Sequence, residues 1–469
     1  MLQSKYIGSF IFLLIIQALS FGQTPSAVYK LPPFEKTVLK NGLTIYLMEQ
    51  HEVPVIDVSV IMPAGAIYDN PQQSGIAVMT AASLKLGTKN MSKAKLEEEL
   101  DFLGAEVATD DSKESAYLKA KFAAKDSEKV LNIIRDILLT PVFDTTEFEK
   151  QKKLLVAQLE RAKESPRNVI GEYFDQVMYR GHVYSNPTNG TIATVTRLTA
   201  ADAQKFYKTY YIPNGSAFAI VGDFVTKDMK AKLTSLFSTW QKGSVPSKAT
   251  DNLSAASNES AVLLVNKDDA KETTFFIGGQ GVPRNNPDFV AMEVVNTVFG
   301  GRFTSWLNDE LRVNSGLTYG ATSGFNRLKS AGTFRISTFT ATKNTEAAID
   351  KTLEVLKRLH TNGIDEKTLA SAKNYVKGQY PPRHETSEQL AGLLTQMFWY
   401  DFDESFINNF QKNVDGLTLE KAKQVIAKYF PRDKLQFVMV GKAADIRAIA
   451  AKYGKVTEGD IKNEVLTAF

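Results

Sequence analysis

The feature of this sequence that most constrains its fold is an internal repeat with an offset of about 219 residues. Two segments each predict an amphipathic helix that begins after a threonine, then a turn containing proline, an apolar strand and a glycine. They are "LTAADAQKFYKTYYIPNGSAFAIVGD" (198–223) and "LTLEKAKQVIAKYFPRDKLQFVMVGK" (417–442). Thr199 corresponds to Thr418, and Gly222 corresponds to Gly441. The repeat therefore predicts two copies of one folding unit.

A second pair of segments supports the duplication. Asp144 opens a predicted helix that leads to Tyr179, and Asp365 opens another that leads to Tyr400, 35 residues later in each case. The chain of 469 residues is also too long to fold around one hydrophobic core, so at least two domains are expected.

The boundaries of the two units follow from a change in composition. Residues 242–260 are rich in Ser, Gly, Asn and Ala, which is typical of a linker. We therefore expect a first unit over residues 30–241 and a second unit over residues 261–469.

The first 22 residues differ from the rest of the chain. Lys5 precedes an almost uncharged apolar run from Ile7 to Leu19, and small residues follow at Ser20 and Gly22. This pattern predicts a cleavable secretory signal over residues 1–22. An N-terminal membrane anchor is the alternative, although the run is shorter than the roughly 20 residues that a span needs. We expect an exported chain, periplasmic or secreted, with no further membrane span.

Inside each unit, helical and strand patterns alternate. Periodicity and capping residues predict helices over 92–103, 127–139 and 144–162, a half-buried strand over 115–122, and a hairpin-like pair of strands over 318–325 and 333–340. Strands separated by helices indicate an α+β fold, in which each unit has a mixed sheet covered by helices on one face.

Several kinds of chemistry are excluded or disfavoured by composition. The chain has no cysteine, so disulfides, cysteine nucleophiles and thiolate metal sites are ruled out. The four histidines, His51, His182, His360 and His384, never share the spacing that places two metal ligands on one helical face. There is no G-x-S-x-G elbow or phosphate-binding glycine motif. With a net charge of only +4, nucleic acid is not an expected partner.

The second unit carries the most suggestive local arrangement, "GGRFTSWLNDELRVNSGLTYGATSG" (300–324). It predicts a turn at Gly300 and Gly301, followed by a helix with Phe303, Leu307 and Leu311 along one stripe.

In this prediction the helix ends at Arg312, and a strand that carries Tyr319 begins after a short loop. A guanidinium and a phenol on either side of a tight turn are able to donate hydrogen bonds to a carbonyl or a developing oxyanion. The pattern also has a purely structural interpretation, because arginine is favourable at a helix C-terminus and tyrosine is common in strands.

At "GIAVMTAASLKLGT" (75–88), the chain resembles the insulinase/pitrilysin-like zinc peptidases, which include the mitochondrial processing peptidase and bacterial two-chain enzymes. In that family a segment like G-L-A-H-F-L-E-H-M-L-F-K-G-T carries the inverted zinc motif H-x-x-E-H. The resemblance covers essentially the whole chain after the signal. It implies a tandem duplication of the α+β unit with a LuxS/processing-peptidase-like fold.

All four positions of the family's zinc site are replaced in this chain. Val78 and Ala82 stand where the resemblance places two histidine ligands, Ala81 stands at the general-base glutamate, and Gln158 stands at the third ligand. Neither alanine nor valine is able to bind zinc or to accept a proton from water. We therefore expect no zinc or other cofactor in this chain, and no peptidase activity from this chain alone.

The resemblance keeps one other part of the family pattern, an arginine and a tyrosine seven residues apart in the second half. Arg312 and Tyr319 match this pair, and the Gly300 and Gly301 turn precedes them. By resemblance, these residues bind the substrate backbone and stabilise the oxyanion. Ser305-Trp306-Leu307 departs from the S-R-L that often follows the glycines.

Two functions follow from the resemblance. In the first, the chain is the zinc-free subunit of a heterodimeric peptidase that acts on peptides, and its partner is a homologous subunit that carries H-x-x-E-H and zinc. In the second, the chain is an inert scaffold or peptide-binding protein of the same fold. Retention of both Arg312 and Tyr319 favours the first.

Overall fold

The computed structural model describes residues 28–244 and 259–464. The predicted signal over residues 1–22 lies outside the described residues, and so do residues 245–258 of the predicted linker. For this reason the unit boundaries drawn at residues 241 and 261 stay predictions. Within the described residues, no helix has both the length and the apolar character that crossing a membrane would need.

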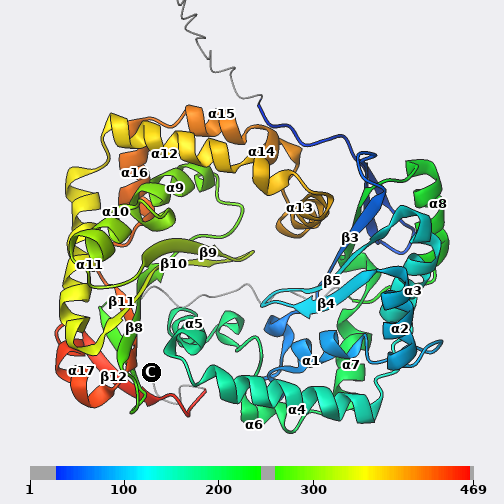
Figure 1. Ribbon diagram of the computed structural model, residues 1–469, viewed down its shortest axis with the longest axis horizontal. Helices are drawn as coiled ribbons and strands as arrows, with labels where there is room; N and C mark the ends of the chain where they lie inside the picture. Colours follow the sequence, from blue (N-terminus) through cyan, green and yellow to red (C-terminus); the bar gives the residue numbers. More distant parts are fainter. Residues whose placement is uncertain (1–27, 245–258, 465–469) are drawn as a thin grey trace, which may run out of the picture.

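Among the described residues, twelve strands form two sheets that stand at opposite ends of the molecule (Figure 1). The first sheet has the order β1-β2-β6-β3-β5-β4. Its strands are β1 (Glu35–Val38), β2 (Thr44–Glu49), β3 (Val55–Met62), β4 (Glu106–Asp111), β5 (Ala116–Ala123) and β6 (Ala217–Gly222). The second sheet has the order β12-β7-β11-β8-β10-β9. Its strands are β7 (Ala261–Asn266), β8 (Glu272–Gln280), β9 (Ala321–Arg327), β10 (Gly332–Ala341), β11 (Gln436–Gly441) and β12 (Lys455–Asp460).

Strand directions show that the two sheets are copies of one plan. In the first sheet β2 and β6 are parallel and the other pairs are antiparallel. In the second sheet β7 and β11 are the corresponding parallel pair. The edges differ, because β1 runs antiparallel to β2 whereas β12 runs parallel to β7. The predicted tandem duplication of a mixed-sheet unit is therefore confirmed.

Helices connect the strands in a matching order in the two units. The first unit has α1 (Ile76–Ser83), α2 (Lys93–Leu103), α3 (Ser127–Leu139), α4 (Thr145–Ala162), α5 (Pro166–Met178), α6 (Ile192–Val195), α7 (Ala200–Tyr210) and α8 (Thr226–Phe237). The second unit has α9 (Phe289–Asn296), α10 (Trp306–Asn308), α11 (Thr345–Asn362), α12 (Glu366–Gln379), α13 (Ser387–Tyr400), α14 (Glu404–Asn408), α15 (Phe410–Asp415), α16 (Leu419–Tyr429) and α17 (Ala443–Ala450). Two π-helical turns, η6 (Thr297–Gly301) and η7 (Asp309–Asn314), flank α10.

The predicted helices over 92–103, 127–139 and 144–162 are found as α2, α3 and α4. The repeated threonines cap α7 and α16 in the same way. The Thr199 side chain accepts from the Asp202 N–H at 3.2 Å, and the Thr418 side chain accepts from the Lys421 N–H at 3.2 Å.

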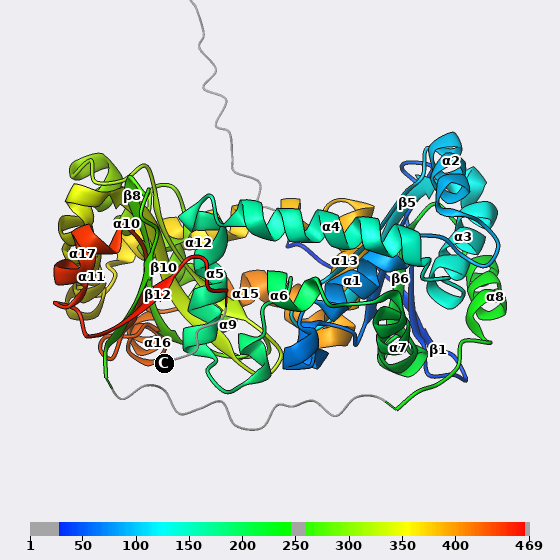
Figure 2. The same cartoon turned by 90° about the horizontal axis from the view of Figure 1, so that it is seen from below.

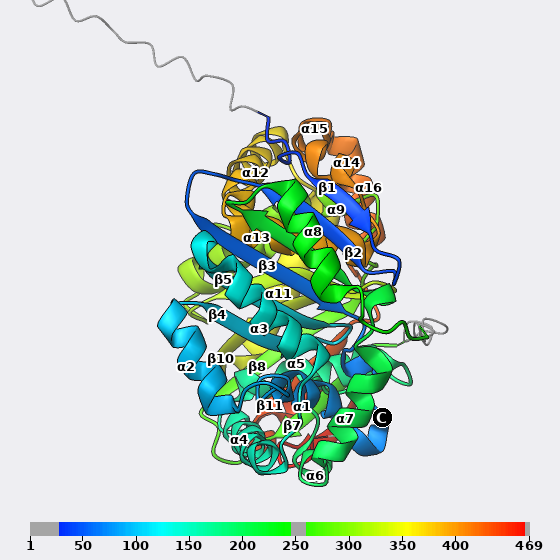
Figure 3. The same cartoon turned by 90° about the vertical axis from the view of Figure 1, so that its right-hand side faces the viewer.

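Each sheet is covered by helices on both faces, not on one face as predicted. On the outer face of the first sheet, α3 packs against β5 and α8 packs against β2 (Figure 3). The inner face of this sheet is covered by α13, which belongs to the second unit by sequence and packs on β3 and β6. The reverse holds at the other end, where α5 of the first unit packs on β8 and β11. The two units thus exchange one helix each.

Side-chain contacts show how closely the exchanged helices fit. On α13, the Thr395 hydroxyl lies 3.1 Å from the hydroxyl of Ser59 on β3. On α5, the ring of Phe174 lies 5.7 Å from the ring of Phe276 on β8. A Cβ at Gly278 would lie 2.1 Å from the Phe334 carbonyl oxygen on β10 and 2.8 Å from Phe174 Cζ, so the neighbouring strand requires glycine there and the helix also approaches it closely. Apolar burial at both ends therefore ties the two units into one folded body.

Polar contacts between the tips of two hairpins join the units at the centre. The β4–β5 tip holds Glu114, whose carboxylate accepts from the Tyr184 hydroxyl at 2.5 Å and from the Lys329 N–H at 3.0 Å. Lys329 belongs to the β9–β10 tip, so this buried carboxylate bridges the two sheets. Beside it, Lys113 Nζ lies 2.8 Å from an oxygen of Asp175 on α5.

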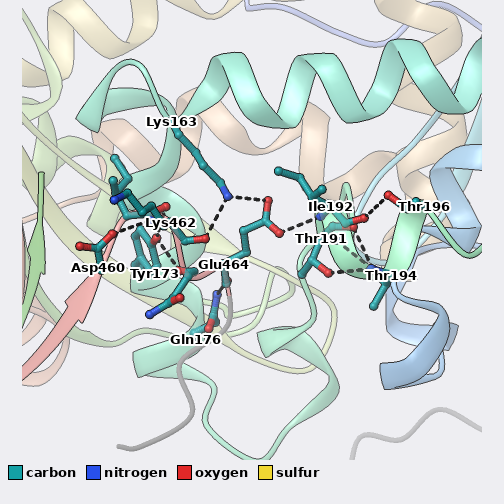
Figure 4. A network of polar contacts seen from close by, with 12 residues as sticks. Lys163, Tyr173, Gln176, Thr191, Ile192, Thr194, Thr196, Asp460, Lys462 and Glu464 are labelled. Carbon is teal, nitrogen blue, oxygen red and sulfur yellow. Dashed lines mark hydrogen bonds and ion pairs between the residues drawn. The ribbon is translucent and has the colours of Figure 1, made fainter.

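The C-terminal segment after β12 forms a third connection to the first unit, in which α4 runs lengthwise between the two ends (Figure 2). Glu464 accepts from the Ile192 N–H at 2.7 Å and pairs with Lys163 at 3.2 Å (Figure 4). The Tyr173 hydroxyl donates to the Asn463 carbonyl at 2.8 Å. The Glu464 carboxylate thus makes charge-assisted bonds at the C-terminal end of α4 and at the start of α6, and a neutral hydrogen bond joins the segment to α5.

Candidate functional site

In the first unit, the helix α1 is held in place by a remote cap. Gly75 begins the helix with a left-handed φ of +94°, and Asp69 accepts from its N–H at 2.7 Å and from the Ala77 N–H at 3.2 Å. Burial raises the pKa of Asp69, while these N–H groups act in the opposite direction. Asp69 was not predicted from the sequence, because an aspartate six residues before the helix start is not in a cap position.

Only one stripe of α1 and its C-terminal continuation is open to the surroundings. Val78, Ala82 and Lys85 are partly exposed along it. Six residues of α1 are buried: Ile76, Ala77, Met79, Thr80, Ala81 and Ser83. Val78 and Ala82, the positions that the resemblance assigns to histidine ligands, therefore lie one helical turn apart on the open stripe.

The remaining two positions of the predicted zinc site also lack the required chemistry. Ala81 is 1% exposed, and Gln158 is exposed on α4, which packs against α1. Over residues 28–244 and 259–464, no group of three or more histidines, cysteines or carboxylates is able to hold a metal ion. The residues at this position therefore do not fit zinc.

Lys85 is the charged residue on the open stripe of α1, and its ammonium donates to the Val107 carbonyl of the edge strand β4. Burial lowers the pKa of Lys85. A lysine on a free strand edge is a common way to block pairing with another chain. Lys85 on this stripe thus occupies a carbonyl of the edge strand, which opposes pairing of that strand with another chain.

A buried carboxyl group lies at the end of the same strand. Oδ2 of Asp111 has no hydrogen-bond partner among the described residues. Burial and the neighbouring Asp110 raise the pKa of Asp111 to about 8. The Asp111 carboxyl group is therefore mostly protonated at neutral pH, which makes it a poor metal ligand.

In the second unit, the glycine turn is a site of close packing. A Cβ at Gly300 would lie 2.3 Å from Ser323 Oγ and 2.6 Å from Ser323 N on β9, so η6 approaches the sheet only with glycine there. A Cβ at Gly301 would lie 2.9 Å from Asn296 Nδ2. Close packing therefore explains why glycine occupies both positions, and the role of the two glycines in substrate binding stays a prediction.

The helix expected after this turn differs from the prediction. Ser305 precedes a short α10, which continues directly as the π-helical turn η7. Leu307 and Leu311 are both fully buried. Phe303 is 67% exposed, and the prediction that it shares one helical stripe with them was wrong because the helix starts only after Ser305.

Arg312 lies in η7 with its guanidinium exposed. Its Cζ is 4.7 Å from the centroid of the Phe303 ring, a cation–π distance that explains why this phenylalanine stays at the surface. The Gly316 N–H donates to the Arg312 carbonyl at 3.2 Å, and the Leu317 N–H donates to the Leu311 carbonyl at 2.8 Å. These bonds turn the chain back toward β9.

Tyr319 lies at the other end of this turn and is 83% exposed. The prediction that a strand carries it was wrong, because β9 begins at Ala321. Its neighbour Thr318 is buried and lies 3.1 Å from the Thr338 hydroxyl, which anchors the backbone. Among the described residues, neither the Arg312 guanidinium nor the Tyr319 hydroxyl has a hydrogen-bond partner. Both groups are free to bind a group from outside.

Comparison with known families decides the identity of the fold. Residues 44–192 match the family described as "Insulinase (Peptidase family M16)", and residues 197–376 match the "Peptidase M16 inactive domain". Together the two matches span well over half of the chain. The chain belongs to the M16 peptidase family. The expected resemblance is thereby confirmed, and the loss of the zinc motif agrees with an inactive member of M16.

Some relatives of this chain are named zinc proteases and others are named non-peptidase homologs. An uncharacterized zinc protease of Rickettsia felis is 23% identical over 73% of this chain and 82% of its own length. A non-peptidase homolog, YmxG of Helicobacter pylori, is 21% identical over 85% of this chain and 94% of its own length. A crystal structure of a peptidase M16 inactive domain from Pseudomonas fluorescens superposes with a TM-score of 0.81. It is 23% identical and covers 87% of this chain and 98% of its own chain, which supports the shared fold.

Proposed function

We propose that this chain is the zinc-free subunit of a two-chain M16 peptidase and supplies Arg312 and Tyr319 to the active site of its partner. The partner is a homologous subunit that carries H-x-x-E-H, and the substrates are peptides. The proposal includes export of the chain, on the strength of the signal-like residues 1–22.

The observation that carries the proposal is the exposure of unpaired polar groups in the second unit. A guanidinium and a phenol hydroxyl are both hydrogen-bond donors, and neither has an internal partner among the described residues. Facing a peptide, the Arg312 guanidinium is suited to bind a backbone carbonyl. The Tyr319 hydroxyl is suited to donate to the oxygen on which negative charge develops.

The surroundings of the pair resemble an interface more than an ordinary surface. Phe303 is 67% exposed and Val313 is 66% exposed, next to Arg312 and close in sequence to Tyr319. Aromatic residues and arginine are enriched at binding hot spots. Large apolar side chains gathered on the surface of a monomer usually mark a contact with another molecule.

A second candidate function is that of a catalytically inert scaffold or peptide-binding protein. The name of the Helicobacter pylori relative, a non-peptidase homolog, favours it. A scaffold has no chemical need for a hydrogen-bond donor at Tyr319. The two functions therefore predict different peptide cleavage when this chain is mixed with its zinc-motif partner.

The test is to purify this chain and a homologous H-x-x-E-H chain from the same organism separately, and to assay peptide cleavage by each chain and by an equimolar mixture. The expected result is cleavage by the mixture that neither chain shows alone, together with elution as one complex. A stable complex with no cleavage above that of the zinc-motif chain would contradict the proposal and favour the scaffold. Cleavage by this chain alone would contradict both.

A further inference from the structure

A cavity of about 420 Å³ lies in the second unit and reaches Gly301 of the glycine turn, but its lining includes neither Arg312 nor Tyr319. Its walls come from α9, α12, α13, β9 and the loops that join them. Much of the wall is aromatic, with Phe289, Phe325, Phe402 and Phe406 among the lining residues. A cavity of this size suits a small organic molecule.

Two arginines share one aromatic ring in this cavity. The guanidinium carbon of Arg327, on β9, lies 3.9 Å from the centroid of the Phe289 ring. The guanidinium carbon of Arg284 lies 5.2 Å from the same centroid. Both side chains are only partly exposed, so two like charges are held close together with little water to screen them.

The cavity supplies one counter-charge, Glu293, which acts on both arginines without pairing directly with either. Glu293 is the one carboxylate among the lining residues, and it pairs with Arg383 at 2.9 Å. In the described chain, neither Arg284 nor Arg327 forms an ion pair with a carboxylate.

Hydrogen bonding is incomplete as well. Arg327 Nε is buried without a partner within the described ranges, and Arg284 makes only a long contact, 3.4 Å, with Gln396 Oε1. Burial and the neighbouring Arg284 lower the pKa of Arg327 to about 9, so both effects oppose its charge. A guanidinium nevertheless remains protonated at neutral pH, and a buried unpaired charge is costly.

We infer that this cavity binds the carboxylate of a small organic acid with an apolar side, held by Arg284 and Arg327. Guanidinium forks match the two oxygens of a carboxylate, and two such forks on one ring point to one shared anion. The partly exposed rings of Phe402 and Phe406 provide the apolar contact. A free acid and the C-terminal residue of a peptide both present this chemistry. The cavity shares Gly301 with the predicted substrate-binding turn, but the inference does not rest on the proposed role of Arg312 and Tyr319.

The first experiment uses the unmodified chain and calorimetric titration. N-acetylphenylalanine is the probe, and its amide and inorganic phosphate are the comparison ligands. The expected result is one binding event for the acid, with at least tenfold weaker binding of the amide and of phosphate. No measurable binding of the acid, or equal binding of acid and amide, would overturn the inference.

Variants then assign the binding to the two arginines. Arg327→Met and Arg284→Met should each weaken binding of the acid at least tenfold. Arg335→Met is the matched control, because Arg335 also lies over a phenylalanine, Phe276 at 4.9 Å, but outside the cavity. It should leave binding unchanged. Unchanged binding in a folded Arg327→Met chain would place the acid elsewhere and overturn the inference.

A final pair of ligands shows whether the carboxylate comes from a free acid or from the C-terminus of a peptide. A short peptide that ends in phenylalanine is titrated with its C-terminus free and with its C-terminus amidated. If only the free peptide binds as tightly as N-acetylphenylalanine, the site accepts peptide C-termini. If neither peptide binds while N-acetylphenylalanine does, the site takes small free acids, and the inference holds with that ligand.

Discussion

The two units keep the same strands and helices but differ in what they present to the outside. In the first unit, the open stripe of α1 carries Val78, Ala82 and Lys85, none of which is able to bind a metal in place of the family's histidines. In the second unit, η7 presents Arg312 and the turn after it presents Tyr319, and neither polar group has an internal hydrogen-bond partner among the described residues. Both copies therefore keep the same packing, whereas at these positions only the second presents hydrogen-bond donors that lack an internal partner among the described residues.

The difference shows that the packing of α1 does not depend on the residues of its open stripe. The buried side of α1, together with the cap by Asp69, holds the helix without any contribution from the open stripe. Substitutions on such a stripe cost little stability, so a metal site is lost without unfolding. At Gly300, by contrast, packing against β9 restricts the residue directly.

The largest expected effect is on zinc binding, when metal ligands are introduced into the first unit. The unmodified chain and the single variant Val78→His should bind no stoichiometric zinc, because one ligand is not enough. The combined variant Val78→His, Ala82→His and Gln158→Glu places three ligands on α1 and the adjoining α4, and it should bind about one zinc per chain. Atomic absorption of dialysed protein measures this. About one zinc in the unmodified chain would contradict the comparison.

Truncating the exchanged helices tests whether each unit depends on the other. Phe174→Ala on α5 should cost about 4 kcal/mol of unfolding free energy, and Leu394→Ala on α13 about 3 kcal/mol, because both side chains are buried. Hydrogen exchange should rise first in β8 and β11 for Phe174→Ala, and first in β3 and β6 for Leu394→Ala. Leu154→Ala, on the exposed side of α4, is the control and should change stability by less than about 0.5 kcal/mol. Exchange that rises only in the unit to which each helix belongs by sequence would contradict the swap.

The last expected effect concerns Asp111, the final residue of β4, a strand that packs against α1. Its pKa is about 8 in the folded chain, against about 4 in an unfolded chain. Between these values the folded chain holds a proton that the unfolded chain has released, so stability falls as the pH rises through this window. Asp111→Asn removes this dependence.

Urea unfolding at pH 5 and pH 8 measures this effect. The variant should gain stability relative to the unmodified chain between the two pH values, by no more than about 3 kcal/mol, because only the unmodified chain loses a folded-state proton over this range. A gain that is equal at both pH values, or larger at pH 5, would show that Asp111 is ionised in the folded chain.

The sequence predicted the larger features of the fold from local signals. The repeat of Thr199 and Thr418 indicated the duplication, and both residues cap their helices as expected. The helix exchange was not predictable, because Phe174 and Thr395 sit on amphipathic helices whose partner sheet no local pattern specifies.

The candidate sites were predicted less completely. Arg312 and Tyr319 were found through the family spacing, but a regular helical stripe misplaced Phe303, since π-helical turns have no sequence period that would identify them. Arg284 and Arg327 are far apart in sequence and meet only through folding. An arginine at the end of the otherwise uncharged strand β9 was the one local signal.

The most direct test of the difference between the units measures kcat/KM for peptide cleavage by mixtures with the zinc-motif partner. One mixture contains the unmodified chain, one contains Tyr319→Phe, and one contains Ala82→Ser on the open stripe of α1. The expected result is a loss of about 10²-fold for Tyr319→Phe, the usual scale for removing one oxyanion donor, and a change within about twofold for Ala82→Ser. A Tyr319→Phe mixture that cleaves at the unmodified rate, or an equal loss in both variants, would contradict the claim that only the second unit retains catalytic chemistry.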